Sequence, residues 1–486
     1  MERGMKSNMS NNHSSAVASS ALLEKWGFEA GVFNADEARK ETRLDSVMEY
    51  PDWFFEVLGN VKNLDFIIIT GPRGAGKSSI RRSIAEHCRN QIGNDILGGN
   101  VLCVNIDHDS PNWVKNFVLN PQKPSVDYFC EEILEQLLVA VLAYAEIDNL
   151  KDKLEKKEAF FLERQIYRLQ EKRPDDISAM ADRLLSKYKR ARNSEFVKDW
   201  LSIITTLFGN QISLENRTIE TPAIDDLPIM IQIIKKCDFD AVYILVDEID
   251  EYDSTTGKPD YAAEIVVPIL SSINLLEKDS FGLKFFLSAP VYQRLDSVSK
   301  TMKMEIRYDR TLQPEPYILD WSDENIAVML KKRLMSYNCK NINSLNGFCA
   351  DDIDDIDSQI VKYSYHNPRH MIQLCDRIVR YTARVAYNVD FHITKQIFDK
   401  ALKDFCLAVS KSIYTENYLR ALVDFREKII VDKKFAETNE ITTEESREIL
   451  DELTRLGALK SKSKLSGEKR YTICDPRICY LIDCEF

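Results

Sequence analysis

The residues with the clearest capacity for chemistry lie in one short stretch, Gly71-Pro-Arg-Gly-Ala-Gly-Lys-Ser-Ser79. It has the form G-x-x-x-x-G-K-S, it follows the apolar run Phe66–Thr70, and a helix-forming segment comes after it. Backbone N–H groups at the start of such a helix converge on phosphate oxygens, and the helix dipole favours the anion. The stretch therefore predicts a phosphate-binding loop. A glycine-rich turn that binds nothing is the alternative, and the flanking strand and helix disfavour it.

Each residue type in this loop has its own expected role. Glycine permits positive φ and close approach of the backbone, as at Gly74 and Gly76. Lys77 is expected to reach the β- and γ-phosphates, and Ser78 to offer its hydroxyl to Mg²⁺. The sequence has no evident N/T-K-x-D motif for guanine, so ATP with Mg²⁺ is the expected cofactor. The residues expected to contact it are Gly71, Pro72, Arg73, Gly74, Ala75, Gly76, Lys77, Ser78 and Ser79.

A hydrolase of this kind also needs acidic groups beside the phosphates. The apolar run Ala241–Val246 ends in Asp247 and Glu248. Ligands bind at the carboxyl ends of strands in open α/β sheets, so this position suits both acids. We expect Asp247 to orient Mg²⁺ through water and Glu248 to polarise the attacking water. The acids that follow are interpreted as a solvated loop: Asp250, Glu251 and Asp253.

Polar residues farther along the chain are candidates for contact with the γ-phosphate. Ser288 ends the apolar run Leu283–Leu287, where it either senses the γ-phosphate and holds the water or caps the next turn. Arg310 lies between this strand and the next, a connection from which an arginine can reach the nucleotide of a neighbouring protomer. Arg307 is an equal candidate, and an ordinary surface position is the alternative for both arginines.

Another arginine is placed by a helix start. In His366-Asn-Pro-Arg-His370, proline at the first helical position is a start signal. Arg369 then lies in the first turn, a fixed place from which its guanidinium can reach a phosphate of the same chain. A structural arginine bonded to an acid across a helical bundle is the alternative.

The elements that must position these residues alternate between short apolar strands and helices. Such alternation predicts an α/β fold of the P-loop NTPase type, with a parallel sheet covered on both faces. The expected strands are Asp65–Thr70, Asn100–Ile106, Ala241–Val246, Leu283–Leu287 and Glu315–Leu319.

The remaining segments predict further parts. Residues 21–120 and 222–340 would form the ATPase core, and residues 1–20 a disordered tail. Residues 121–221 are helical in period and rich in charge, so we expect a helical insertion, either a solvated arm or a surface for a partner or for oligomerisation. Residues 341–414 predict a small helical lid domain, and residues 415–486 a winged helix. The aromatic residues between Leu22 and Asn60 either cover the adenine or fill a core.

The predicted winged helix has two faces of opposite charge. Its strands carry a basic wing of Lys460, Lys462, Lys464, Lys469 and Arg470. Its candidate recognition helix, Thr442–Leu456, is acidic, with Glu444, Glu445, Glu448, Asp451 and Glu452. The wing could contact DNA phosphates, whereas the acidic helix disfavours reading of the major groove. Contact with a protein is an equal alternative.

Composition restricts the possible partners. The net charge of −12 attracts no nucleic acid to the chain as a whole, so any such contact needs a local basic patch. The eleven cysteines include no C-x-x-C pair, which favours free thiols in a reducing cytoplasm over a zinc site. No run of about eighteen apolar residues occurs, so no membrane span is expected.

With these residues in place, the chain resembles the AAA+/STAND branch of P-loop ATPases, of the kind related to Orc/Cdc6 initiators. The likeness rests on the order of the phosphate loop, ILVDE (244–248), LKFFLSA (283–289), WSDEN (321–325) with KKRL (331–334), and the Asn-Pro-Arg helix. It is also similar to bacterial P-loop ATPases associated with DNA repair and anti-phage defence, through Gly27-Phe28, Phe33, Ala35 and Glu37 before the loop. The resemblance covers roughly residues 25–110 and 240–486, but not the helical insertion.

The resemblance implies ATP hydrolysis, a homo-oligomer linked to nucleotide state, and a sensor or effector partner. The leading hypothesis is a switch in which ATP closes the sheet domain on the helical bundle through Arg369 and assembles protomers. Hydrolysis through Glu248 would then release them. One alternative is a DNA-binding winged-helix protein with a regulatory ATP site. A phosphotransferase is a further alternative, which Glu248 beside Asp247 disfavours because a kinase needs a base for its substrate more than a water activator.

Overall fold

The computed structural model describes residues 18–34, 37–62, 64–89, 96–106, 112–144, 147–172, 221–276, 279–308, 315–338, 340–385, 392–465 and 468–484. Contacts divide the chain into two compact units. The first, here the sheet unit, contains Tyr50–Arg73 and Lys77–Leu319. The second, here the helical unit, contains the residues up to Glu49, Gly74–Gly76 and Asp320–Phe486. The tail expected over residues 1–20 lies almost entirely outside the described residues.

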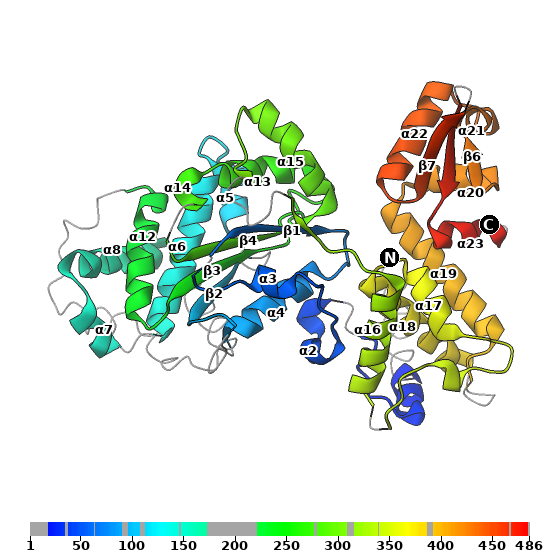
Figure 1. The fold of residues 1–486 in the computed structure, drawn as a ribbon, viewed down its shortest axis with the longest axis horizontal. Helices are drawn as coiled ribbons and strands as arrows, with labels where there is room; N and C mark the ends of the chain where they lie inside the picture. The colour runs from blue at the N-terminus through cyan, green and yellow to red at the C-terminus, as the bar shows by residue number, and fades with distance from the viewer. Residues whose placement is uncertain are drawn as a thin grey trace, which may run out of the picture. The chain divides into compact units, whose positions relative to one another are not determined.

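A five-stranded parallel sheet forms the centre of the sheet unit (Figure 1). Its order is β2-β3-β4-β1-β5. The strands are apolar along their length because helices cover both faces of the sheet. This arrangement confirms the predicted α/β class. The strands are β1 (Phe66–Gly71), β2 (Val101–Ile106), β3 (Ala241–Val246), β4 (Phe281–Ser288) and β5 (Tyr317–Ile318).

Helices on the two sides of this sheet bury its apolar faces. Figure 1 shows α4 on one side of the sheet and α13 with α15 on the other. The helices of the unit are α3 (Phe54–Leu58), α4 (Lys77–Arg89), α5 (Asn112–Leu119), α6 (Ser125–Tyr144), α7 (Ile147–Lys153), α8 (Lys156–Lys172), α12 (Ala223–Lys236), α13 (Pro259–Leu270), α14 (Ile273–Leu276) and α15 (Ala289–Met302).

Helix α6 lies inside the segment that the sequence predicted to be an insertion. Its residues Phe129, Ile133 and Leu137 are fully buried and belong to the same cluster as the strands of the sheet. The ring centroids of Phe129 and Phe285 of β4 lie 6.1 Å apart. This part of the segment is therefore a core helix and not a solvated arm. Residues 173–220, the rest of the expected insertion, lie outside the described residues.

One lysine is buried in the core of the sheet unit. Lys284 of β4 is 1% exposed, and its Nζ lies 4.3 Å from the ring centroid of Tyr243. Burial lowers the pKa of Lys284 from 10.5 to about 8. The ring offsets part of the cost of burying the ammonium group, because the face of an aromatic ring attracts a cation.

The lowered pKa means that the charged ammonium of Lys284 destabilises the folded chain at pH 7, by about 1.4 kcal/mol for each pKa unit. Methionine removes this charge but also loses the contact with the Tyr243 ring. We therefore expect Lys284→Met to raise the free energy of unfolding at pH 7 by about 2 kcal/mol. The pKa of Lys284 is lower in the folded chain, so the unfolded chain binds more protons between pH 8 and 10.5. Wild-type stability should therefore rise with pH across this window, and the variant should lose this rise. Urea unfolding at pH 7 and at pH 9.5 measures both effects, with the exposed Lys300→Met as control. A less stable Lys284→Met protein at pH 7 would contradict the prediction.

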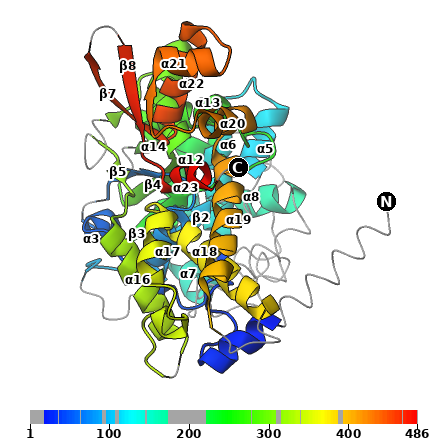
Figure 2. The ribbon, with the colours of Figure 1, turned by 90° about the vertical axis from the view of Figure 1, so that its right-hand side faces the viewer.

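The helical unit consists of a helical bundle followed by a small antiparallel sheet in the order β6-β8-β7. In Figure 2, β7 and β8 form a hairpin beside α21 and α22. This order of elements agrees with the predicted helical bundle after the sheet, and adds β6 and α23. The hairpin beside α22 lies where the sequence predicts a winged helix, which stays a prediction. The elements are a helix over 18–26, η1 (Ala38–Lys40), α2 (Leu44–Val47), α16 (Asp323–Ser336), η4 (Asn346–Phe348), α17 (Ile356–Ser364), α18 (Pro368–Val385), α19 (Lys395–Ile413), α20 (Glu416–Phe425), β6 (Ile429–Val431), α21 (Asp432–Thr438), α22 (Thr443–Arg455), β7 (Leu459–Leu465), β8 (Glu468–Ile473) and α23 (Pro476–Asp483).

The segment before residue 50 packs in the helical unit and not in the ATPase core that we expected from residue 21 onward. Trp26 stacks on Phe348, with ring centroids 4.7 Å apart. Arg333 of α16 donates to Glu41 at 2.6 Å, and both side chains are buried. These contacts join parts of the chain that are distant in sequence, so local patterns do not show this boundary. The buried aromatic residues of this segment fill a core.

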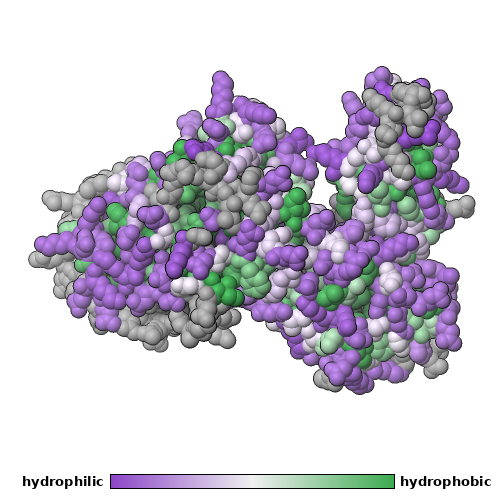
Figure 3. All heavy atoms as spheres, in the orientation of Figure 1, coloured by the Kyte–Doolittle hydropathy of each residue, from purple (hydrophilic) through white to green (hydrophobic). Residues whose placement is uncertain are grey.

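The sequence predicts no membrane span, and the described helices and the surface bear on this expectation. Among the helices that the structure describes, none is long and apolar enough to cross a membrane. On the face drawn in Figure 3, most of the coloured surface of both units is hydrophilic.

Candidate functional site

The phosphate-loop residues connect β1 to α4, as the sequence predicts. β1 ends at Gly71 and α4 begins at Lys77. Gly74 has φ 85° and Gly76 has φ 101°, a region that side chains strongly disfavour, so the loop needs glycine at both positions. The Lys77 ammonium folds back and donates to the carbonyl oxygens of Gly71 at 2.9 Å and Pro72 at 3.0 Å.

Three residues of the loop, Gly74–Gly76, pack within the helical unit. A Cβ atom on Gly74 would lie 2.7 Å from Oδ1 of Asn367 and 3.0 Å from Cβ of Arg369. The indole of Trp321 donates to the carbonyl oxygen of Ala75 at 2.6 Å. The structure therefore brings the predicted Arg369 beside the middle of the loop, and glycine at position 74 leaves room for this contact.

Arg369 is held by the start of α18. The helix begins at Pro368, as predicted. Oδ1 of Asn367 accepts hydrogen bonds from the backbone N–H groups of Arg369 at 3.0 Å and His370 at 3.3 Å, so it satisfies donors that a helix start leaves open. The side chain of Asn367 thus caps the first turn of α18 and lies beside Gly74.

Asp247 and Glu248 directly follow β3. The Asp247 side chain is 3% exposed, and its Oδ1 accepts the backbone N–H of Glu248 at 2.8 Å. Glu248 has φ 63°, which is the left-handed region for a residue other than glycine. Such a conformation costs about 1–3 kcal/mol and is found most often at functional sites. The chain therefore turns sharply at the acid that we expect to activate water.

An arginine that the sequence analysis did not select lies against Asp247. Nε of Arg81 lies 3.2 Å from Oδ2 of Asp247, with side-chain exposures of 13% and 3%. These two atoms form an ion pair without a hydrogen bond between them. Arg81 stands four positions after Lys77 on α4, and this spacing places the two cations on the same helix face. That spacing was the signal available in the sequence.

The carboxyl end of β4 lies between those of β1 and β3. Ser288 is in register with Gly71, so it adjoins the phosphate loop. It occupies the N-cap position of α15, but its side chain makes no capping hydrogen bond, which disfavours the capping alternative. Its hydroxyl and that of Thr70, a residue that the sequence analysis missed, are buried without a hydrogen-bond partner among the described residues.

These unsatisfied groups test whether the residues fit a nucleotide with its metal. Buried polar atoms almost always have a partner, so Thr70 Oγ1 and Ser288 Oγ mark a place where a further polar group fits. Asp247 Oδ2 has an ion pair with Arg81 but no hydrogen bond among the described residues, so it can also accept one. All three lie at the carboxyl edge of adjacent strands of the sheet. Hydroxyl and carboxylate oxygens suit Mg²⁺ and phosphate-bound water. The residues at this edge therefore fit a nucleotide with a bound Mg²⁺.

The other predicted residues lie apart from this cluster or are not described. Arg73 pairs with Glu251 at 3.5 Å across an exposed surface, where such a pair contributes little. Arg307 donates its backbone N–H to Leu270 at 3.1 Å, after the end of α15. Arg310 lies outside the described residues.

Comparisons with known proteins add little to this geometry. No family model matches the chain, and no curated protein matches it. Among solved structures, the chain is similar to the Aeropyrum pernix ORC2 protein, which was solved as ADPNP–ADP complexes. The two are 11% identical with a TM-score of 0.40, over 94% of this chain and 97% of that chain. A score this low supports no conclusion, so the class of the protein rests on its own fold and site: an α/β protein of the P-loop type.

Proposed function

We propose that this chain is an ATP-binding and ATP-hydrolysing switch of the AAA+/STAND type. The observation that carries the proposal is the convergence of three strand ends. The phosphate loop follows β1, Asp247 and Glu248 follow β3, and Ser288 ends β4, which pairs with both other strands. This edge is where open α/β sheets bind their ligands.

Different residues of the chain would carry out different steps of ATP hydrolysis. Ser78 and Asp247 would hold the metal, which supplies Lewis-acid polarisation of the phosphoryl group when bound. Lys77 would exchange the carbonyl oxygens of Gly71 and Pro72 for the phosphates. Glu248 would accept the proton of the attacking water. The hydroxyls of Thr70 and Ser288 would orient that water or the γ-phosphate.

The switch needs groups that respond to the nucleotide. Arg369 is the proposed sensor within the same chain, supported by its place beside Gly74 and by its fixed position in the first turn of α18. Arg310 and Arg307 are the proposed residues for contact with the nucleotide of a second copy, so that ATP would assemble a homo-oligomer. An effector protein bound through residues 121–221 is proposed from the charge-rich helical pattern of that segment, and a role in anti-phage defence from the family resemblance. A cytoplasmic location is proposed from the scattered cysteines.

DNA binding through the wing is the second candidate. Its support is that Lys460 of β7 and Arg470 of β8 are exposed on adjacent antiparallel strands. However, Lys469 lies 3.0 Å from the carboxylate of Asp451 of α22 in a partly exposed pair. This pair lowers the positive charge of the wing, so we place the nucleotide switch first.

The experiment that tests the proposed function is equilibrium binding of a fluorescent ATP analogue with Mg²⁺. Lys77→Ala should weaken binding about 100-fold, since it removes hydrogen bonds between an ammonium group and phosphate that are worth about 1.5–3 kcal/mol each. Lys62→Ala, at an exposed position before β1, is the matched control and should bind as wild type. Equal affinities of Lys77→Ala and wild type would refute the proposed site.

A further inference from the structure

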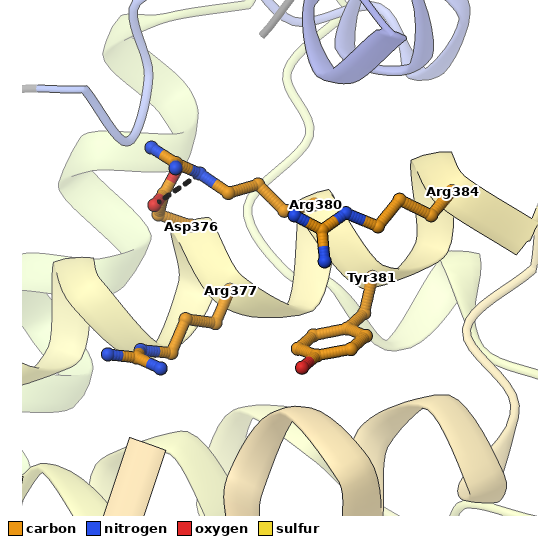
Figure 4. A pocket seen from close by; sticks show the side chains of 5 residues that line it. All are labelled: Asp376, Arg377, Arg380, Tyr381 and Arg384. Carbon is orange, nitrogen blue, oxygen red and sulfur yellow. Dashed lines mark hydrogen bonds and ion pairs between the residues drawn. The ribbon is translucent and has the colours of Figure 1, made fainter. Parts of the chain in front are cut away.

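The second half of α18 carries arginines around a tyrosine (Figure 4). Arg377, Arg380, Tyr381 and Arg384 stand at spacings of three, four and seven residues, which places them on one side of a helix. Together with Asp376 they line a cavity of about 260 Å³. Figure 4 shows the arginine side chains spread along the helix, with Tyr381 between Arg377 and Arg384.

The backbone beneath this arginine face is held rigidly. The other side of α18 is buried in the bundle through Leu374, Cys375, Ile378 and Val379. A helix packed in this way cannot rotate to hide its arginines. The cationic groups therefore project from fixed points along the helix axis, and binding costs less ordering than on a mobile loop.

Contacts from α19 fix the tyrosine ring. The Tyr381 hydroxyl donates to the Asp404 carboxylate, a bond that raises the pKa of Tyr381. Arg377 donates to the Asp404 carbonyl oxygen at 3.3 Å. The Arg384 guanidinium and the Lys400 ammonium each lie 5.5 Å from the centroid of the Tyr381 ring. The ring is thus anchored at its phenol end and flanked by two cations.

Charge is the feature that sets this face apart from the chain as a whole. Four cations, Arg377, Arg380, Arg384 and Lys400, meet two carboxylates, those of Asp376 and Asp404. The local balance is positive, whereas the whole chain carries −12. An ion pair between Arg380 and Asp376 at 2.8 Å involves an arginine side chain that is 52% exposed. Such an exposed pair is weak and leaves the guanidinium able to take another anion.

We propose that this face of α18 binds single-stranded nucleic acid, with the arginines on successive phosphates and the Tyr381 ring against a base that displaces one of the two cations from the ring face. The planar guanidinium donates two parallel hydrogen bonds to a phosphate. Aromatic rings in a cationic groove are the usual means of binding unpaired bases without reading sequence. A duplex keeps its base faces stacked, and a purely acidic chain such as polyglutamate offers carboxylates to the arginines but no ring to stack on Tyr381. This site goes beyond the proposed ATPase activity and does not involve the wing.

Fluorescence anisotropy with labelled oligothymidine and oligouridine of about 12 nucleotides tests the proposal on the full chain. The double variant Arg380→Gln/Arg384→Gln should lose at least about tenfold in affinity, and its salt slope should fall by about 1.4, because each phosphate contact on a single strand contributes about 0.7. Tyr381→Ala should lose about tenfold with an unchanged slope, while Tyr381→Phe keeps the ring and should bind as wild type. The relative affinity of the two oligonucleotides shows whether DNA or RNA is the better ligand.

Arg420→Gln on α20 is the matched control. Arg420 also pairs with an acid four residues away, Glu416 at 3.1 Å, and is 67% exposed, but it lies outside the proposed face. It should bind as wild type, and circular dichroism should show that all variants are folded. The proposal is overturned by wild type that does not bind at low salt, by a double variant that binds as tightly as Arg420→Gln, or by duplex DNA or polyglutamate that binds as tightly as the single strand.

Discussion

Glu248→Gln should reduce ATP turnover by about 100-fold or more while leaving ATP binding intact. Glutamine has the size of glutamate but cannot accept a proton, and general-base catalysis typically contributes a factor of about 10²–10⁴. Glu248 is not expected to hold the phosphates, so affinity should change little. Steady-state phosphate release together with equilibrium binding of the ATP analogue separates the two effects.

The same variant should accumulate the ATP-bound assembly if hydrolysis releases the protomers. Size-exclusion chromatography with light scattering should then show a mass increase with ATP in Glu248→Gln that persists longer than in wild type. Glu251→Gln is the matched control, since Glu251 lies three residues away in an exposed pair with Arg73. A Glu248→Gln protein that hydrolyses ATP at the wild-type rate would remove Glu248 from the mechanism.

Arg81→Gln should destabilise the ligand-free protein by about 3–5 kcal/mol, the usual cost of leaving one partner of a buried ion pair without its counter-charge. Asp247 is that partner, and its side chain is 3% exposed. With Mg²⁺ and ATP the loss should be smaller, because a metal held by Asp247 supplies the missing positive charge. Urea unfolding with and without Mg-ATP measures both values.

The neighbouring Arg82 is the matched control for this variant. It pairs with Glu86 at 3.0 Å on the helix surface, where side-chain exposures are 30% and 22%. Arg82→Gln should therefore change stability by less than about 1 kcal/mol. An Arg81→Gln protein that loses the same stability with and without Mg-ATP would show that Arg81 is structural and does not respond to the metal site.

The parts of the site that the sequence predicted are those with local signatures. The phosphate loop needs glycine at Gly74 and Gly76 for positive φ, and these glycines stand at fixed offsets from Lys77. Pro368 marks the start of a helix because its fixed φ suits the first helical position, and this start places Arg369 in the first turn. Runs of apolar residues ending in polar ones gave β3 with Asp247 and β4 with Ser288. In each case the physical cause acts over a few residues of chain.

The parts that could not be predicted depend on contacts between distant residues. The place of β4 between β1 and β3 is set by packing of the whole sheet, and it is this order that brings Thr70 and Ser288 to one edge. The pairing of Arg333 with Glu41 spans 292 positions and moves the N-terminal segment out of the expected core. Helix α6 was interpreted as part of a charged insertion. Its largely apolar sequence is typical of a buried helix, but does not show which surface it packs on.

Phosphate release from ATP by wild type and Lys77→Ala at increasing Mg²⁺ concentration decides whether the chain is a metal-dependent ATPase. The proposed ATPase site predicts turnover by wild type that requires Mg²⁺, with little or none in Lys77→Ala. Hydrolysis by Lys77→Ala at the wild-type rate would contradict it, as would wild type that binds ATP with Mg²⁺ yet releases no phosphate in the presence of oligothymidine, oligouridine or duplex DNA.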